Sequence, residues 1–389
     1  MTATGHIRKR VGKNGAVSYQ LTVESPSGIG GKRNRNYATV KGTKKQAEAV
    51  LRQMISEVES QTYVRPSKIT VAEWMDEWMA TYIINSRSVT TIDGYKNQIE
   101  NYLVPALGDV YLQDLTPAMV QRWVNQLRER SPLTGKPLAP KTVRNIWLNL
   151  STAMDRALIE DLIKKNPCQH TQLPQKEKYE ADVYDQEEIE KLLEAANGTD
   201  MELPMLLEVC LGLRRGELLA LKWDKIDFEH ARVTICENLV EVNKVLYTKT
   251  PKTRSGIRTL EIPPSLLEKL REARLRYLEQ KIRLGGDFHD DGYVVCQENG
   301  KPYKPDSMGC KFRRFLKDNG LRPIRFHDLR HTNATLMLTN GISPKVAQQR
   351  LGHADFSTTM NIYSHVLESV DREAANAIDQ AIFGSTKLA

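Results

Sequence analysis

Two short polar stretches divide the 389-residue chain into three units, and this division limits the folds open to it. Residues 60–69 and residues 167–180 lack the apolar periodicity of the sequence around them and are typical of linkers. A chain of this length also favours two or three domains with sizeable cores. We therefore expect a multidomain protein with units at 1–59, 68–166 and 180–389.

The first unit carries the whole positive surplus of the chain. The formal charge of the protein is +8, and residues 1–53 hold eleven lysines and arginines against only Glu24 and Glu48. This segment therefore stands at +9 and the remaining residues together at −1. A surplus concentrated in this way indicates a module that binds a polyanion.

The same unit has the pattern of a small folded domain. Residues 17–24 alternate apolar and polar side chains as a half-buried strand does, and 33–40 and 6–11 are candidate partners. Thr43 and Gln46 form a capping box that predicts a helix to about residue 57. Such a sheet can enter a DNA major groove as a ribbon. The candidate DNA contacts are Arg33, Arg35, Lys44 and Lys45. A disordered basic arm is the alternative.

The second unit is expected to be all-helical. Helix-start signals and apolar faces predict four amphipathic helices, which would form a compact bundle without revealing a function. The helices are expected to begin at Thr70, Thr90, Thr116 and Lys141, the last of them ending at Ile163.

The third unit reads as a mixed α+β domain. Asp185 and Glu188 indicate a helix start, and Met201–Leu211 a second helix. The strands are expected at 233–235, 239–245 and 258–262, as one small antiparallel sheet around a turn at 253–256. The later helices are expected at 265–283, 306–319 and 326–340. The fold class is thus multidomain and mainly α, with small antiparallel sheets.

Polar groups suited to a phosphodiester recur within residues 327–365. His327 and Arg330 are three residues apart, and His353 follows a glycine that predicts a left-handed helix cap. Ser343 and Pro344 are typical of a helix N-cap and first turn. A tyrosine, Tyr363, follows ten residues after His353.

Together these motifs resemble the C-terminal signature of the tyrosine recombinases, the family of phage and conjugative-transposon integrases. That family also has an arginine in a Gly-x-Arg-x-Gly-Glu context upstream, and here Gly212 to Glu217 supply it with Arg214. A lysine is expected between the two motifs, and Lys252 fits.

The resemblance implies a metal-free cleavage of DNA. Arg214 and Arg330 would clamp the non-bridging oxygens of the phosphate, since guanidinium groups can donate two hydrogen bonds each. Tyr363 would be the nucleophile and form a 3′-phosphotyrosyl bond. Lys252 would be the general acid that protonates the leaving 5′ oxygen, with Lys249 as the runner-up.

The histidines and carboxylates near these residues have less definite roles. His327 would exchange a proton with the tyrosine, and His353 would donate to a non-bridging oxygen or to the phenol. Glu217 and Asp328 are expected to orient an arginine or cap a helix. Of the remaining histidines, His331 and His365 are open between a structural role and the lining of the site.

The partners and location follow from the same resemblance. Residues 1–59 would bind arm-type DNA sites, 68–166 would be the SAM-like core-binding domain, and 180–389 would catalyse integration, and also excision, of a mobile element or prophage. A homotetramer on double-stranded DNA is expected, and an accessory DNA-bending or excision factor is left open. Five cysteines without a metal-ligand pattern and no long apolar run indicate a cytosolic protein that does not cross a membrane. The resemblance implies the cytoplasm of a bacterial host, association with the nucleoid, and no cofactor.

Two other functions fit parts of the pattern. A type IB topoisomerase shares the tyrosine chemistry but does not need a separate basic head. A catalytically silent DNA-binding regulator could use the same scaffold, and would be expected to have lost at least one catalytic position.

Overall fold

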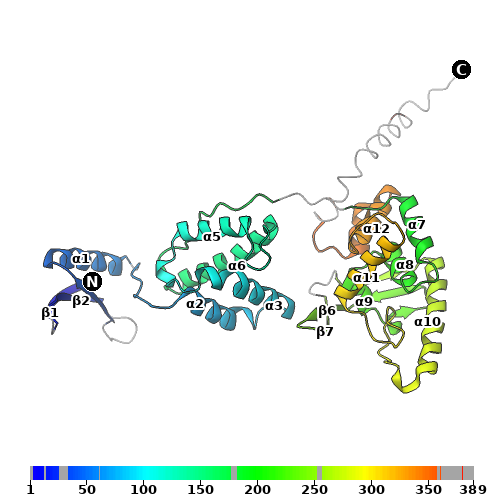
Figure 1. Cartoon of the computed structure of the whole chain (residues 1–389), viewed down its shortest axis with the longest axis horizontal. Coiled ribbons are helices and arrows are strands. Elements are labelled where there is room, and N and C mark those ends of the chain that lie inside the picture. The colour runs from blue at the N-terminus through cyan, green and yellow to red at the C-terminus, as the bar shows by residue number, and fades with distance from the viewer. Residues whose placement is uncertain are drawn as a thin grey trace. The chain divides into compact units, whose positions relative to one another are not determined.

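The structure is a computed structural model of the whole chain, and its elements are labelled in Figure 1. It forms two compact units, Met1–Lys178 and Tyr179–Ala389. The residues that the structure describes are 3–12, 15–25, 34–60, 62–176, 182–251, 256–356, 360 and 379.

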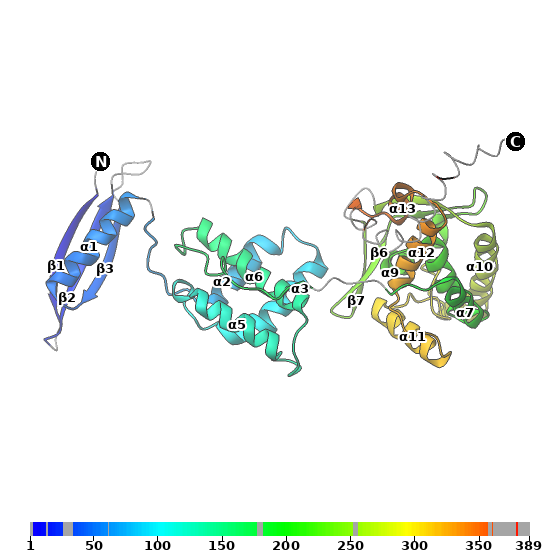
Figure 2. The ribbon, with the colours of Figure 1, turned by 90° about the horizontal axis from the view of Figure 1, so that it is seen from above.

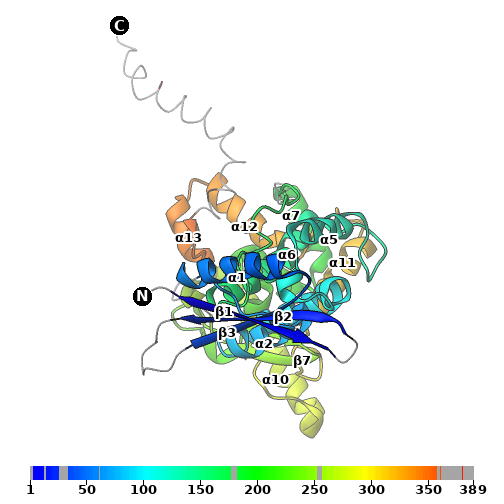
Figure 3. The ribbon, with the colours of Figure 1, turned by 90° about the vertical axis from the view of Figure 1, so that its left-hand side faces the viewer.

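The chain begins with the expected three-stranded sheet. Strands β1 (Thr4–Val11), β2 (Val17–Ser25) and β3 (Asn34–Lys41) are antiparallel and lie in sequence order. Helix α1 (Lys44–Glu59) crosses one face of the sheet (Figure 3). The alternation in the central strand places Leu21 and others against that helix, so the predicted sheet and helix are confirmed.

Residues 70–159 form the expected helical bundle around two buried tryptophans, Trp74 and Trp78. The last helix ends at Ile159 and not at Ile163 as predicted, because Asp161 adopts a left-handed conformation with φ of 55°. A turn of π-helix follows α2 and another follows α3. The helices are α2 (Val71–Trp78), α3 (Val89–Gln98), α4 (Val104–Leu107), α5 (Pro117–Glu129) and α6 (Pro140–Ile159).

The second compact unit is built around helix α8, which packs against α7, α10 and α12. Figure 2 shows α10 on the outside of this unit and α12 inside it. The predicted helices are confirmed to within a few residues. They are α7 (Gln186–Ala196), α8 (Glu202–Leu211), α10 (Pro264–Leu284), α11 (Pro305–Asp318), α12 (Asp328–Thr339) and α13 (Pro344–Leu351). A further short helix, α9 (Arg215–Ala220), was not predicted.

The strands of this unit differ from the prediction. The segment 239–245 was expected to be one strand of a single sheet, and this was wrong. Asn243 and Lys244 both have positive φ, 51° and 66°, and make a two-residue hairpin turn. The segment is therefore divided between two strands, and the strands form two separate sheets. These are β4 (Ile226–Asp227), β5 (Arg232–Ile235) and β8 (Arg258–Glu261) in one, and β6 (Asn238–Val242) with β7 (Val245–Lys249) in the other.

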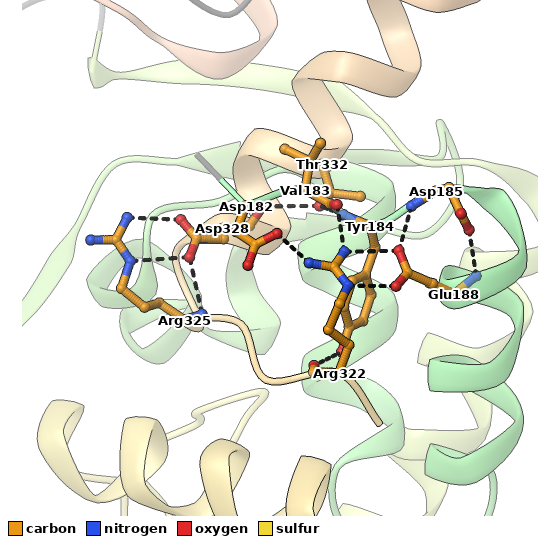
Figure 4. Close-up of polar contacts among 9 residues, drawn as sticks. All are labelled: Asp182, Val183, Tyr184, Asp185, Glu188, Arg322, Arg325, Asp328 and Thr332. Carbon is orange, nitrogen blue, oxygen red and sulfur yellow. Dashed lines mark hydrogen bonds and ion pairs between the residues drawn. The ribbon is translucent and has the colours of Figure 1, made fainter. Parts of the chain in front are cut away.

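A polar cluster ties the start of this unit to the loop that leads into α12 (Figure 4). The guanidinium of Arg322 donates to Glu188 at 2.6 and 2.8 Å, and to the Val183 carbonyl at 2.7 Å. The Tyr184 N–H donates to Thr332 Oγ1 on α12 at 3.1 Å. The N-terminus of α7 and the first turns of α12 are thereby held together, and α12 carries several of the predicted site residues.

Candidate active site

Arg214 lies in the turn between α8 and α9, at the N-cap of α9. Helix α8 ends at Gly212, whose φ of 60° and ψ of 45° are left-handed, and this turn brings the arginine back across the helix end. The Arg214 Nη1 donates to Glu217 Oε1 at 2.6 Å and Nη2 donates to the Gly352 carbonyl at 2.7 Å. The side chain is 38% exposed, so solvent reaches it.

Arg330 lies in the first turn of α12 and is fully buried. Its Nη1 donates to the Gly212 carbonyl at 2.7 Å and its Nη2 to the Leu351 carbonyl at 2.6 Å. Burial, and next the charge of Arg214, lowers the pKa of Arg330 to about 9. The guanidinium therefore remains charged at neutral pH.

The two arginines are held by helix C-termini. Both α8 and α13 end on a left-handed glycine, Gly212 and Gly352, and the carbonyls at these ends carry the negative pole of the helix dipole. Guanidinium groups satisfy carbonyls that would otherwise lack a partner. The predicted left-handed cap at Gly352 is confirmed.

Glu217 is the carboxylate at the centre of the arginines. It is buried, it binds Arg214, and its Oε2 accepts from Arg258 Nη2 at 2.8 Å and lies 3.9 Å from Arg330 Nη1. Burial alone would raise its pKa, but the hydrogen bond and charge of Arg258, with Arg214, outweigh burial and lower the pKa to about 2. The interpretation of Glu217 as a residue that orients an arginine is confirmed.

The two predicted histidines lie beside this cluster. His353 follows Gly352 directly and is 8% exposed. Burial, with the charges of Arg330 and Arg214, lowers its pKa to about 3. His327 is the N-cap of α12, where burial and His331 lower its pKa to about 4. Both imidazoles are therefore neutral at pH 7.

His331 packs edge-on against His327, with 5.1 Å between the ring centroids. Its Nδ1 is buried and has no hydrogen-bond partner among the residues that the structure describes. Asp328 lies in the first turn of α12, and its carboxylate accepts from Arg325 Nη2 and Nε at 2.8 and 3.0 Å, and from the Arg325 N–H. Of the two roles expected for it, orienting an arginine is the one that these contacts bear out.

The structure thus brings together Arg214, His327, Arg330 and His353. Lys252, Tyr363 and His365 lie outside the described residues. Lys249, the alternative general acid, is the last residue of β7 and pairs with Asn238 across the hairpin.

In the N-terminal unit, Arg35 on β3 is paired with Glu24 of β2 at 2.8 Å. Lys44 and Lys45 are exposed at the start of α1, and Arg33 lies outside the described residues.

Two charged side chains that are buried near this cluster were not predicted from the sequence. Arg258, at the start of β8, is bound to Glu217. Glu208 on α8 is fully buried, and neither carboxylate oxygen has a hydrogen-bond partner in the described part of the chain. Burial raises the pKa of Glu208 well above its ordinary value. The sequence held one weak signal for each of them. Glu208 lies one turn before the Gly212 cap, and Arg258 is the first residue of a predicted strand.

The residues that the structure describes include no cluster of three or more His, Cys, Asp or Glu side chains that could hold a metal ion. No helix in the described part of the chain combines the length and apolar character of a membrane span.

The chain matches two known protein-family models. Residues 182–369 match the model of the phage integrase family, and residues 70–128 match the phage integrase N-terminal SAM-like domain. A XerC-like tyrosine recombinase of Caldanaerobacter subterraneus is 30% identical over 386 residues, which cover 94% of this chain and 96% of the relative. The ICEBs1 integrase of Bacillus subtilis is 26% identical, with 88% and 92% covered.

Solved structures have the same fold. The Tn1549 transposon integrase bound to transposon right end DNA aligns with a TM-score of 0.66 at 21% identity, over 80% of this chain and 99% of that one. A lambda integrase tetramer bound to a Holliday junction aligns with a TM-score of 0.56 at 22% identity, over 92% and 94%. With these relatives and family models, the chain belongs to the phage integrase family of tyrosine recombinases and is a site-specific DNA recombinase.

Proposed function

We propose that this recombinase holds the scissile phosphate with Arg214 and Arg330 and cleaves the strand with Tyr363. The observation that carries the proposal is the arginine pair itself. Two guanidinium groups from elements more than 100 residues apart are fixed on helix-end carbonyls and around Glu217. Such pre-oriented donors can stabilise the charge that grows on the non-bridging oxygens in the transition state.

The bond changes balance without an external energy source. The Tyr363 oxygen forms a bond to phosphorus, the bond from phosphorus to the 5′ oxygen breaks, and the tyrosine proton passes to a base. A proton must reach the leaving oxygen, and Lys252 would supply it, with Lys249 as the alternative. The phosphotyrosyl bond retains the energy of the diester, so a second 5′ hydroxyl can reverse the step.

The neutral histidines suit two roles in this scheme. His327, with its pKa near 4, can accept the tyrosine proton at neutral pH without first losing one of its own. His353 can donate a hydrogen bond as a neutral imidazole while adding no further positive charge beside Arg214 and Arg330. The tautomer that donates is the one protonated on the nitrogen facing the phosphate.

A basic cleft beside His327 supports DNA as the substrate. Its volume is about 720 Å³, and Arg215, Arg313 and Arg325 line it together with His327. Among the described residues that line it, Asp306 is the one carboxylate, and it pairs with Arg215 at 3.4 Å. We propose that the DNA backbone next to the scissile phosphate lies along this cleft.

The full chain would act as a homotetramer on double-stranded DNA, with core and arm sites bound by different units. Residues 1–59 would bind the arm site through Arg33, Arg35, Lys44 and Lys45. Residues 68–166 would bind the core site together with the catalytic unit, 180–389. Support comes from the basic head and from the DNA complexes and tetramer named for the related structures. An accessory DNA-bending or excision factor stays open, as it was in the sequence.

Covalent capture tests the proposal. A nicked suicide substrate that carries a candidate attachment site should trap the wild-type enzyme as an adduct on denaturing gels, and it should do so in EDTA because guanidinium groups meet the phosphate charge. Tyr363→Phe should bind the DNA and form no adduct. Tyr293→Phe, a matched change outside the site, should react as wild type does. An adduct formed by Tyr363→Phe, or one that requires added magnesium, would contradict the proposal.

A further inference from the structure

A third arginine belongs to the cluster that holds the proposed phosphate clamp. Arg258 opens strand β8, and its side chain is only 7% exposed. Its Nη2 donates to Glu217 Oε2 at 2.8 Å, and its Nε donates to the Arg350 carbonyl at 2.7 Å. A buried guanidinium with these partners is not part of a solvated charged surface.

The three arginines share one helix end. The carbonyls of Arg350, Leu351 and Gly352 are consecutive at the C-terminus of α13, and they accept from Arg258, Arg330 and Arg214 respectively. Three guanidinium groups from three separate segments therefore fix the residues that immediately precede His353. Any shift of this helix end would move both clamp arginines and the histidine together.

A second contact makes the link between β8 and α13 reciprocal. Arg350 Nη2 donates to the Glu261 carbonyl at the other end of β8, at 3.1 Å. Arg258 and Arg350 thus join the strand and the helix at two points. The same strand pairs with β5, which fixes it in the sheet.

This arrangement of charges lowers the stability of the fold, which suggests that it has a role in the reaction. Arg214, Arg258 and Arg330 surround one carboxylate, Glu217, and two of the three, Arg258 and Arg330, are buried. Burying charges without a full set of opposite charges destabilises a fold in general. Apolar side chains of similar volume would fill the same space at lower cost. An anionic ligand between these groups would offset their repulsion.

We propose that Arg258 is a positioning residue that aligns the phosphate clamp: it fixes Glu217 on one side and the end of α13 on the other. This inference rests on the proposed role of Arg214 and Arg330 in binding the scissile phosphate. Arg258 itself does not contact DNA in this scheme. The planar guanidinium of Arg258 donates hydrogen bonds to Glu217 and to the Arg350 carbonyl in two different directions at once. A lysine ammonium cannot do this in the same geometry.

The test uses the full-length Arg258→Gln and Arg258→Lys variants in single-turnover cleavage of the suicide substrate. Arg232→Gln is the matched control, since Arg232 lies on the neighbouring strand β5 and pairs with Glu261 at an exposed site. Arg258→Gln should cleave the ordinary phosphodiester about 10²-fold more slowly than wild type, Arg258→Lys should be intermediate, and Arg232→Gln should be unchanged. DNA affinity should be the same for all four proteins.

Two altered substrates separate alignment of the clamp from a general structural defect. A methylphosphonate at the scissile position lacks one negative charge and needs less stabilisation by arginine, so Arg258→Gln should come within roughly a few-fold of wild type on it. A 5′-bridging phosphorothiolate needs no proton on its leaving group, and the deficit should persist there. Lys252→Ala and Lys249→Ala are the comparison: whichever of them has lost the general acid should recover its cleavage rate on the sulfur substrate.

A deficit of Arg258→Gln that is the same on the methylphosphonate, or one that disappears on the sulfur substrate, would overturn the inference. Should Arg258→Gln fail to fold, as judged by its thermal melting, Arg258→Lys carries the same comparison. Wild-type enzyme that forms no adduct overturns the proposed function and this inference with it. If wild type forms the adduct and Arg258→Gln cleaves the ordinary phosphodiester as fast as wild type, this inference alone is overturned.

Discussion

His353 is mostly buried and lies within electrostatic reach of Arg214 and Arg330. Burial and these two charges lower its pKa from 6.5 to about 3. In the unfolded chain the imidazole returns to its ordinary pKa. Between these two values the unfolded state binds a proton that the folded state does not, so falling pH favours unfolding through this residue.

Comparison of wild type with His353→Gln isolates this effect. Between pH 7.5 and 5 the free energy of unfolding of wild type should fall by about 1–2 kcal/mol more than that of the variant. Urea titrations at several pH values measure the difference. Glu208 acts with the opposite sign, because its raised pKa adds stability as the pH falls, but it is present in both proteins and cancels. Equal pH dependence of the free energy of unfolding for the two proteins would show that the pKa of His353 is not lowered in the folded state.

The residues found from sequence and those missed differ in one physical respect. Arg214, His327, Arg330 and His353 are recognisable because short motifs surround them. Arg258 has no such motif, and its partners Glu217 and Arg350 are 41 and 92 residues away. Whether an arginine is buried depends on such distant partners, which local sequence does not contain. The same holds for Glu208, whose burial comes from the packing of α8 inside the unit.

At the scale of elements, the site depends on where helices end. The carbonyls released at Gly212 and Gly352 are the acceptors for Arg330 and Arg214. A side chain at Gly212 would be strained by its φ of 60°, and its Cβ would also meet Asn333 Oδ1 and Leu351 Cδ2 inside contact distance. These neighbours belong to α12 and α13, which hold the rest of the site.

Gly212→Ala should therefore destabilise the protein more than conformational strain alone explains. Gly198→Ala is the matched control, because Gly198 also has positive φ, 73°, and its Cβ would meet nothing within 4 Å. We expect a loss of about 1–2 kcal/mol for Gly198→Ala, from strain, and of roughly 3 kcal/mol or more for Gly212→Ala, where overpacking adds to it. Denaturant titration compares them. Equal losses would mean that the close packing at Gly212 is not rigid.

Elements with local signals were predicted well. The capping boxes at Thr43, Thr70 and Asp185 each begin a helix where the sequence indicated. The hairpin of β6 and β7 was missed because its turn holds Asn243 and Lys244, and lysine is not a typical residue for a left-handed turn position. The expected sheet that contains 233–235 and 258–262 is confirmed, since β5 pairs with β8 in antiparallel fashion.

At the scale of the whole molecule, three stretches of the described chain each bury a large hydrophobic cluster, and a small fourth cluster lies between α12 and α13. One cluster lies under α1, one in the helical bundle and one around α8. The formal charge is distributed as unequally as the sequence showed, with +9 in residues 1–53 and −1 in the rest. The DNA-binding roles of the separate units cannot be read from their cores, because a packed core supports many functions. They stay predictions, and a truncation can test the first of them.

Removal of residues 1–59 should leave cleavage at the core site largely intact and abolish a separate binding activity for arm DNA. The remaining chain keeps the bundle and the candidate site, whereas the removed part holds the basic sheet. Phosphate contacts release counterions, so a protein that neutralises roughly six phosphates loses on the order of 10³ in affinity from 50 to 200 mM salt. Full-length protein should show this steep salt dependence on arm DNA. In the double variant Lys44→Gln with Lys45→Gln, the slope of affinity against salt should correspond to about two fewer neutralised phosphates. Equal affinity and equal salt dependence for the truncated and complete chains on every DNA tested would show that this segment is not a DNA-binding domain.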